Sequence, residues 1–391
     1  MPLDTSILNI HGYEITRIHG RKPLIYEARY TGKVRCPFCR GEDLEKKAKY
    51  IRRLNHESIG LRRTELHLDA TKFYCTSCKR YFNQRFPGVL MYKRSTEAFR
   101  AEVFERHANG HTQSYLSKSL GIGTATVERW FHDYLERKVA ETKNTPCPRV
   151  MGIDEHFFTR RKGYATTICN LRNHKVYDVT LGRSESALEA YFARLKGKED
   201  VMVVVMDLSK TYRNIIEKHF PNAAIVSDRF HVIRLVNHHS LKVWADIDPA
   251  GRKNRGLLSL MRRHKWNLKH EQIKNLYSYL SLYPGLKAIY DFKQDLVRLL
   301  LTKKQTAYQC KKLIPLFLDC IYKLKDSALD SLVTLGKTLE SWQEEVVRMF
   351  RFTKSNGILE GFHNKMETIS RRAYGFRNFE NYRLRVKALC C

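Results

Sequence analysis

The sequence predicts a multidomain protein that combines α+β and α/β regions with a large all-α region. Three observations support this prediction. Short strand-like segments with two CxxC pairs lie before residue 87, apolar runs alternate with amphipathic stretches between residues 149 and 232, and residues 233–350 have a helical pattern almost throughout. With 391 residues, of which 43% are hydrophobic, the chain is long enough to bury several cores.

The chain is strongly basic. It has 71 Lys+Arg against 40 Asp+Glu, which gives a formal charge of +31. This excess is far beyond what solubility requires. It indicates a polyanionic partner, because a basic surface binds phosphates by releasing condensed counterions. A ribosomal-type or merely basic protein is the alternative.

Targeting signals are not apparent. Met1–Ile10 lacks the pattern of a signal peptide, and no run of about 18 apolar residues is present, so we expect a cytoplasmic protein without a membrane partner. The ten cysteines are therefore expected to be reduced.

Residues 1–87 are expected to form a zinc ribbon. Two residues separate the cysteines of each pair, a spacing that fits a turn around one metal ion, and two such turns complete a tetrahedral site. The 35 residues between the pairs (40–74) are expected to contain a hairpin from Tyr50 to Tyr74. A redox dithiol or two unrelated pairs is the alternative to structural Zn²⁺. The four predicted ligands are Cys36, Cys39, Cys75 and Cys78.

Residues 88–145 are expected to form a helix-turn-helix. A first helix over 112–120, a turn over 121–123 and a second helix over 124–135 fit this motif. Thr124 and Thr126 lie at the N-terminal end of the second helix, the end that touches base edges in such motifs, and Arg129 can reach bases or phosphates. An ordinary helical hairpin is the alternative. Pro146 and Pro148 then mark a domain boundary.

Residues 146–232 alternate strand and helix. Strands are predicted over 149–158, 164–171, 175–181, 201–208 and 223–227, and helices over 184–195 and 211–220. The first three strands follow one another so closely that they should be antiparallel. The order β-β-β-α-β-α-β is the ribonuclease H-like arrangement, a mixed sheet with helices on both faces. In that topology the first and fourth strands are neighbours.

Three acidic residues define the predicted active site. Asp154 and Asp207 close the first and fourth strands, and Glu360 lies where a helix should begin. Clustered carboxylates bind hard divalent cations, which bridge the attacking and leaving oxygens in phosphoryl transfer. The alternative is that each acid caps a helix or ends a strand in solvent. Glu155 adjoins Asp154, and alternation along the strand should direct one of the two away from the site.

Asp228 and His231 are secondary candidates for this site. They lie three residues apart after the last strand, so the start of a helix would place them on one face. Asp228 could orient a water molecule or a basic side chain, and His231 could contact a phosphate or hold the loop of Asp207. In the alternative interpretation, Asp228 only caps the following helix.

The remaining segments are helical. Residues 233–350 form an insertion whose leucines and phenylalanines (for example Leu296, Leu300, Leu316 and Phe317) are expected to build a core of its own, or in part a dimer surface. Residues 351–391 form a basic tail with interleaved aromatic residues. The tail could hold a DNA backbone through Arg371, Arg372 and Arg377 while its aromatic rings stack on bases. Alternatively, these rings pack into the core.

In combination, these motifs resemble the ISL-three insertion-sequence family of DDE transposases, over essentially the whole chain. The residues that carry the resemblance are the paired CxxC motifs, the helix-turn-helix, Gly152-Ile153-Asp154-Glu155, Met206-Asp207, Asp228-Arg229-Phe230-His231, Ser355-Asn356-Gly357-Ile358-Leu359-Glu360-Gly361 and Arg371-Arg372-Ala373-Tyr374-Gly375-Phe376-Arg377-Asn378-Phe379. The resemblance implies that Asp154, Asp207 and Glu360 bind Mg²⁺ or Mn²⁺ in a ribonuclease H-like domain. It also implies that the helical block is the insertion domain of the family, and that the protein works at the nucleoid of a bacterial cytoplasm.

The implied reaction is cleavage and transfer of DNA. The N-terminal domains would bind terminal inverted repeats, water would hydrolyse a phosphodiester at the element end, and the freed 3′-hydroxyl would attack target DNA. A homodimer or larger assembly is expected, with double-stranded DNA as partner and no small-molecule substrate. Three alternatives stay open: a structure-specific nuclease with the same acids, a non-catalytic (domesticated) DNA-binding regulator, and a zinc-containing RNA-binding protein.

Overall fold

The computed structural model describes residues 9, 11–142, 144–352 and 357–390. The chain divides into two compact units, Met1–Ala140 and Glu141–Cys391. In the part of the chain that the structure describes, no helix is long and apolar enough to span a membrane.

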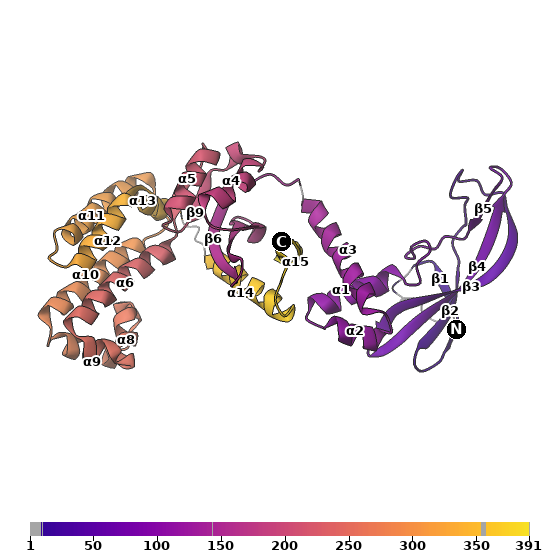
Figure 1. Ribbon diagram of the computed structural model, residues 1–391, viewed down its shortest axis with the longest axis horizontal. Helices are drawn as coiled ribbons and strands as arrows, with labels where there is room; N and C mark the ends of the chain where they lie inside the picture. Colours follow the sequence, from indigo (N-terminus) through magenta and orange to yellow (C-terminus); the bar gives the residue numbers. More distant parts are fainter. Residues whose placement is uncertain (1–8, 10, 143, 353–356, 391) are drawn as a thin grey trace. The chain divides into compact units, whose positions relative to one another are not determined.

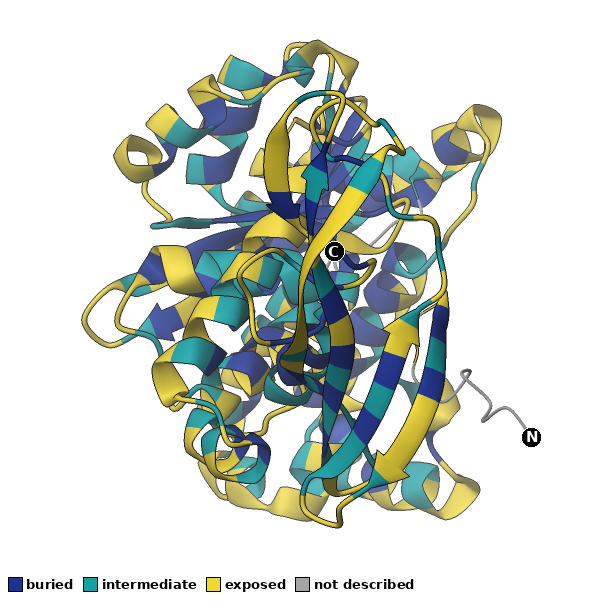
Figure 2. Cartoon of the chain, turned by 90° about the vertical axis from the view of Figure 1, so that its right-hand side faces the viewer, coloured by how far each residue is buried: buried dark blue, intermediate teal, exposed yellow. Residues whose placement is uncertain are grey.

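The first unit is built on a five-stranded mixed sheet. Its strands lie in the order β1-β2-β4-β3, and β5 pairs with β4. β2 and β4 are parallel and the other neighbours are antiparallel. The strands alternate buried and exposed residues (Figure 2), as expected where one face covers a core, here around Leu54, Leu66 and Leu68. Their bounds are β1 Tyr13–His19, β2 Leu24–Tyr30, β3 Leu44–Ile59, β4 Arg62–Cys75 and β5 Arg80–Asn83.

β3 and β4 form the hairpin expected between the CxxC pairs. It is longer than predicted, because the pairing begins at Leu44↔Cys75 rather than at Tyr50. The last residue of β4 is thus a cysteine of the second pair, and β5 follows that pair directly.

Three helices complete the first unit: α1 (Glu97–Ala108), α2 (Gln113–Leu120) and α3 (Thr124–Thr142). Thr112 caps α2 by accepting a hydrogen bond from the backbone N–H of Tyr115, and Gly121 ends it with φ of 66°, a conformation that favours glycine. Five buried residues form the core of the three helices: Phe99, Val103, Leu116, Leu120 and Val127. α2, the turn and the start of α3 therefore lie where the sequence predicts them.

The second unit contains a mixed sheet in the order β10-β9-β6-β7-β8, of which β9 and β6 are labelled in Figure 1. β10, β9 and β6 are parallel, whereas β7 and β8 are antiparallel neighbours on the other side. The predicted element order and the pairing of the first strand with the fourth are confirmed. The elements are β6 Val150–Thr159, β7 Gly163–Asn170, β8 Lys175–Leu181, α4 Glu185–Ala193, η2 Lys198–Asp200, β9 Val203–Met206, α5 Lys210–His219 and β10 Ala224–Ser227.

β9 is shorter than the predicted 201–208. Met202 and Val203 both donate backbone hydrogen bonds to the carbonyl of Arg149, so the regular ladder starts only at Val203. At the other end, the N–H of Ser209 bonds the carbonyl of Asp207 and turns the chain. Asp207 is therefore the first residue after the strand.

Nine helical segments follow the sheet, and they do not form one separate core. Leu296, Leu300 and Phe317 belong to the same buried cluster as the strands of the second unit, whereas Leu316 is 56% exposed, so the expected independent core is only partly observed. A smaller cluster around Trp244 and Tyr290 is separate. The segments are α6 Arg229–Ile247, α7 Pro249–Lys253, α8 Arg255–Arg262, η3 Lys265–Asn267, α9 His270–Leu280, α10 Pro284–Leu300, α11 Ala307–Lys325, α12 Asp330–Ser341 and α13 Gln343–Arg351.

Arg229 ties the helical block to the sheet. It is buried at the start of α6, directly after β10, and its guanidinium donates to the carbonyls of Leu300, Thr302 and Met349. These carbonyls lie at or near the ends of α10 and α13. One cation thus fixes two helices of the block beside the strand ends.

The last two helices, α14 (Gly357–Arg372) and α15 (Phe379–Cys390), return to the sheet. α14 contacts β6 and α15 contacts β8 (Figure 1, yellow). The guanidinium of Arg383 makes two hydrogen bonds to the buried Asp178 on β8, at 2.8 and 2.6 Å, which anchors α15.

Candidate active site

Asp154 and Asp207 lie side by side on two parallel strands. Asp207 follows the end of β9, whereas Asp154 does not close its strand as predicted, because β6 stays paired with β7 up to Thr159. In the ladder between β6 and β9, Ile153 pairs with Met206, so the residue that follows each of them lies at the same level along the two strands. One carboxylate oxygen of each, together with a ring nitrogen of His231, forms a group whose atoms all lie within 4.8 Å of one another. The predicted adjacency of the two strands thus brings the two acids together.

His231 is held between two acids. Its Nδ1 lies 2.8 Å from Oδ2 of Asp207, and its Nε2 lies 3.8 Å from Oδ2 of Asp228. Asp228 occupies the N-cap position of α6, but its side chain makes no capping hydrogen bond. The cap interpretation therefore describes the position of Asp228 in the chain and not the function of its carboxylate, which faces the imidazole.

The site concentrates partly buried negative charge. Burial raises the pKa of Asp154 to about 7, and the nearby charge of Asp207 adds to this effect. Burial alone would lower the pKa of His231, but its hydrogen bond to Asp207 and the charges of Asp207, Asp228 and Asp154 outweigh that effect and raise it. Oδ1 of Asp207 is buried without a hydrogen-bond partner among the described residues. Such an oxygen is costly unless a cation or a donor satisfies it.

Glu360 lines the same cavity from the first turn of α14. The cavity has a volume of about 740 Å³ and is also lined by Asp154, Asp207, Asp228 and His231. Glu360 is exposed, and its carboxylate is not part of the group of atoms within 4.8 Å. Ser355 and Asn356, which precede it in the motif, lie outside the described residues.

Glu155 is the member of the acidic pair that does not join the cluster. Its Oε1 accepts from Arg183 at 3.1 Å, and it lines the edge of the cavity. Basic residues of the helical block, Arg234, Arg262 and Lys303, line the cavity as well. The cavity therefore combines a carboxylate cluster with cations that suit a phosphate backbone.

His363 is a site residue that the sequence interpretation missed. Its Nδ1 lies 3.8 Å from Oδ2 of Asp154, and its Nε2 lies 3.2 Å from Oγ1 of Thr167, which pairs with Asp154 across the β6–β7 ladder. Thr167 also bonds His156, whose other ring nitrogen lies 2.8 Å from the hydroxyl of Tyr382 on α15. Burial lowers the pKa of His363 to about 4 and that of His156 to about 3, so both rings are neutral at pH 7. The sequence did contain a signal for His363: it follows Glu360 by three residues on a predicted helix, which places both side chains on one face.

A family model described as a transposase, of the ISL-three DDE type, matches residues 151–386. The chain belongs to this family. It is also similar to the transposase for insertion sequence element IS1001 of Bordetella parapertussis, with 23% identity over 394 residues, which covers 96% of this chain and 95% of that relative. The residues matched to the ISL-three family include Asp154, Asp207 and Glu360 and lie within the second unit.

The four cysteines lie together in the first unit, outside the residues matched to the ISL-three family. Their sulfurs all lie within 4.8 Å of one another, with 3.5 Å between Cys36 and Cys78 and between Cys39 and Cys75. A tetrahedral zinc site with Zn–S bonds of about 2.3 Å requires similar separations. Burial alone would raise the pKa of Cys36, but backbone hydrogen bonds from Cys39 and Phe38 and side-chain hydrogen bonds from Cys78 and Cys39 lower it to about 6, which favours the thiolate.

The two cysteine turns share one backbone feature. Each is followed by a basic residue with positive φ, 61° at Arg40 and 54° at Lys79. Left-handed geometry at a non-glycine residue is uncommon, and its recurrence at equivalent positions indicates that both turns are shaped for one purpose. The cluster is compatible with a structural zinc ion.

The predicted DNA-contacting residues lie on exposed surfaces. Thr124 and Arg129 are exposed and Thr126 is half-buried on α3. In the tail Arg371, Arg372 and Arg377 are exposed, although Arg371 pairs with Glu367 on its own helix at 2.6 Å. The aromatic residues of the tail divide between the two interpretations: Phe379 and Tyr382 are buried in the core, whereas Tyr374 is 88% exposed.

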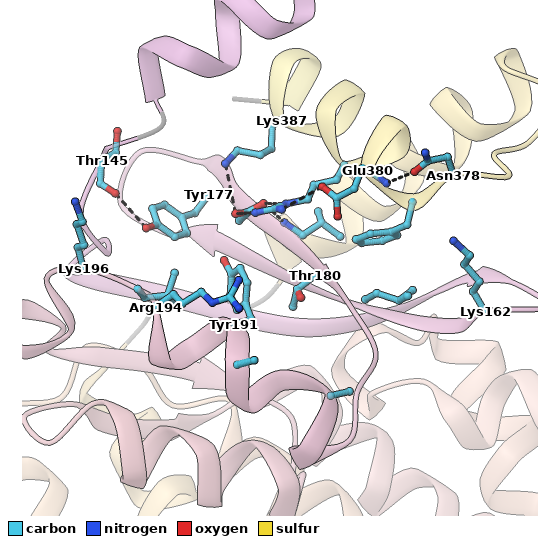
Figure 3. A pocket seen from close by; sticks show the side chains of 18 of the residues that line it. Thr145, Lys162, Tyr177, Thr180, Tyr191, Arg194, Lys196, Asn378, Glu380 and Lys387 are labelled. Atoms are coloured by element: carbon cyan, nitrogen blue, oxygen red, sulfur yellow. Dashed lines mark hydrogen bonds and ion pairs between the residues drawn. The ribbon is translucent and has the colours of Figure 1, made fainter.

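A second cavity, of about 720 Å³, lies between β8, α4 and α15 (Figure 3). Its polar groups are largely paired: Asp178 binds Arg383 and Lys387, and the hydroxyl of Tyr177 donates to the carbonyl of Thr145. No cluster of potential metal ligands is found there among the described residues. This cavity therefore lies at the contact between α15 and β8.

Proposed function

We propose that the chain is a DDE transposase that binds the terminal inverted repeats of an insertion sequence and cleaves and transfers DNA strands in a ribonuclease H-like domain. The observation that carries the proposal is the convergence of Asp154 and Asp207 on adjacent parallel strands, with Glu360 lining the same cavity. The strand order β10-β9-β6-β7-β8, with two antiparallel strands on one side, supports the proposed fold. Membership of the transposase family supports the reaction class.

The donor set fits a pair of hard divalent cations. The unpartnered buried oxygen of Asp207 and the raised pKa of Asp154 both indicate negative charge that the protein alone does not neutralise. Asp154, Asp207 and Glu360 are the residues that would hold two Mg²⁺ or Mn²⁺ ions. When bound, such ions lower the pKa of water and stabilise charge on the attacking and leaving oxygens of the phosphodiester.

The remaining groups of the site act around these ligands. His231 and Asp228 hold the carboxylate of Asp207 in place, and His363 does the same for Asp154 through contacts of 2.8 to 3.8 Å. Arg234, Arg262 and Lys303 are positioned to hold the phosphate backbone across the cavity. After hydrolysis, the freed 3′-hydroxyl occupies the position of the attacking water and displaces a phosphodiester oxygen of target DNA in line.

The first unit recognises the element ends in this proposal. Structural Zn²⁺ at the four cysteines shapes residues 1–87, and the helix-turn-helix of residues 88–145 presents Thr124, Thr126 and Arg129 to base edges. The helical insertion of residues 233–350 divides the catalytic domain into residues 146–232 and 351–391, and the tail adds Arg371, Arg372 and Arg377 as backbone contacts. Because two element ends are joined in one reaction, the active form is a homodimer or larger.

The test is strand cleavage and joining with a labelled inverted-repeat end in Mg²⁺ or Mn²⁺. Asp154→Asn, Asp207→Asn and Glu360→Gln should each abolish both products, while binding of the same duplex persists in a gel-shift assay. Glu367→Gln, an exposed change on the same helix as Glu360, is the matched control and should keep activity.

The products distinguish the competing functions. Cleavage without joining to new DNA would assign a structure-specific nuclease. Duplex-end binding that needs none of the three acids, with no cleavage, would assign a regulator. Preference for RNA over element ends would assign an RNA-binding protein.

A further inference from the structure

A cavity of about 680 Å³ in the first unit is lined by a set of residues that the proposed reaction does not use. Its walls are the middle of β3, residues 81–85 of β5 and the segment after it, and residues 91–94, together with Pro37 and Phe38 of the first cysteine turn. This volume is in the range of ~300–1,000 Å³ that small ligands occupy. We call it the aromatic groove.

The charge of the aromatic groove is uniformly positive. Its lining contains Arg52, Arg53, Arg85, Lys93 and Arg94 and no Asp or Glu. Arg52 serves the fold, because its guanidinium donates to the carbonyls of Leu90 and Lys93. The other four are exposed and form no ion pair with any residue that the structure describes. Their charges are therefore available to an anionic ligand.

The same groove gathers exposed apolar side chains. Six large hydrophobic residues that are more than a third exposed line this one cavity, and clusters of this kind mark interaction sites. They are Phe38, Tyr50, Ile51, Tyr81, Met91 and Tyr92. Four of the six are aromatic, and interleaved aromatic and basic side chains suit nucleotides, whose bases stack on rings while cations hold the phosphates.

Tyr92 is the most exposed of these residues and has a strained backbone. Its side chain is 87% exposed, and its φ is 59°, a conformation that bulky residues rarely adopt. The segment around it is nevertheless fixed: the N–H of Asn55 bonds the carbonyl of Arg94, the N–H of Thr96 bonds the carbonyl of Asn55, and Arg52 holds Leu90 and Lys93. The fold thus holds an aromatic ring out in solvent, where burial does not reward it.

We propose that the aromatic groove binds a stretch of DNA with at least one unpaired base, which stacks on Tyr92 while Arg53, Arg85, Lys93 and Arg94 contact its backbone. The inference rests on the proposal that the chain acts on DNA, and it assigns a surface separate from the helix-turn-helix. A duplex keeps its bases stacked on one another, so only an unpaired base presents a free face to the tyrosine.

The first experiment measures binding by fluorescence anisotropy. Full-length protein, with its metal as purified and with neither added divalent cation nor chelator, is titrated into a labelled single-stranded 20-nucleotide oligothymidylate and into a duplex of equal length. Tyr92→Leu should weaken single-strand binding by about fivefold or more and leave duplex binding unchanged, and Tyr92→Phe should retain it. Tyr308→Leu, a tyrosine 69% exposed on α11, is the matched control. Equal loss on both DNAs, or no loss, would overturn the proposal.

The cations are tested by salt dependence. Lys93→Ala combined with Arg94→Ala should reduce the slope of log K against log[salt] for the single strand by about 1.4, or about 0.7 for each lost phosphate contact. Lys311→Ala with Lys312→Ala, two exposed lysines of α11, should leave the slope as it is. An unchanged slope in the first pair would remove these residues from the binding site.

Photocrosslinking locates the bound base. An oligonucleotide that carries one unpaired 5-iodouracil should crosslink within residues 81–94. Crosslinks found only elsewhere would contradict the assignment. Preferential binding of an acidic protein over DNA in the aromatic groove would contradict it as well. These measurements need no cleavage, so Asp207→Asn should bind the single strand like the natural chain. If the protein binds the single strand through Tyr92 but does not cleave DNA, only the catalytic proposal is rejected. If it cleaves DNA but its single-strand binding does not depend on Tyr92, only the proposal for the aromatic groove is rejected.

Discussion

Replacement of Asp154 by Asn should stabilise the metal-free protein even though it abolishes the proposed reaction. The side chain of Asp154 is only 14% exposed, and Asp207 lies close to it. Its pKa is raised from 3.8 to about 7, first by burial and then by the charge of Asp207. Asn keeps the shape of the side chain and removes the charge. The site is thus expected to trade stability for the ability to bind cations.

The sign of the effect follows from proton linkage. An acid whose folded pKa lies above its unfolded pKa holds its proton longer in the folded state, so ionisation costs the folded state free energy. The contribution of Asp154 to the free energy of unfolding is therefore highest below about pH 4. It falls as the pH rises towards 7 and then levels off. One pKa unit corresponds to about 1.4 kcal/mol, so the rise from 3.8 to about 7 sets an upper limit of about 4 kcal/mol. We expect Asp154→Asn to gain about 2–4 kcal/mol at pH 8.

Urea unfolding followed by tryptophan fluorescence measures this gain. Three of the four tryptophans, Trp244, Trp266 and Trp342, lie in the second unit and report on it. The gain at pH 8 should shrink towards pH 5, and Asp200→Asn, an exposed change before β9, should show neither effect. If Asp154→Asn were no more stable than the natural chain at pH 8, or equally stabilised at both pH values, the described electrostatics of the site would be wrong.

Three further predictions concern the parts that support the site. Arg383→Met breaks the two hydrogen bonds to the buried Asp178 and should lower the free energy of unfolding in urea by about 3 kcal/mol, part of which Asp178→Asn should restore. A decrease below about 0.5 kcal/mol would contradict the anchoring of α15. Cys39→Ser should reduce the zinc content, measured by atomic absorption, from about one ion per chain to near zero, whereas Cys147→Ser should leave it unchanged. Zinc retained in Cys39→Ser would exclude the four-cysteine site. His363→Gln should weaken Mn²⁺ binding about tenfold in calorimetry without changing duplex binding, and unaltered affinity would show that His363 does not position Asp154.

The strands of the second unit were predictable because they are buried apolar runs with short turns between them. Once the element order was known, the parallel pairing of β6 with β9 placed Asp154 beside Asp207. The predicted limits of β9 were less accurate, since Val201 is buried like a strand residue but lies outside the ladder. Burial leaves a pattern in sequence, whereas the end of a hydrogen-bonded ladder depends on the partner strand.

Contacts between distant segments were not predictable in this way. The hydrogen bonds from Arg229 to α10 and α13 join residues about 70 and 120 positions apart, and no hydrophobic periodicity in the sequence predicts them. The link from Asp154 through His363 and Thr167 likewise depends on how α14 lies on the sheet. The helical block was expected to have its own core for the same reason: its apolar positions were visible, but the surfaces that they cover were not.

The central claim is that Asp154, Asp207 and Glu360 together hold divalent cations. The most direct measurement is anomalous diffraction from crystals of the protein with an inverted-repeat end and Mn²⁺. We predict two manganese ions in the cavity between β6, β9 and α14, one ligated by Asp154 and Asp207 and the other by Asp154 and Glu360. Manganese at Asp207 and His231 alone, or no manganese in this cavity with DNA in place, would contradict the claim.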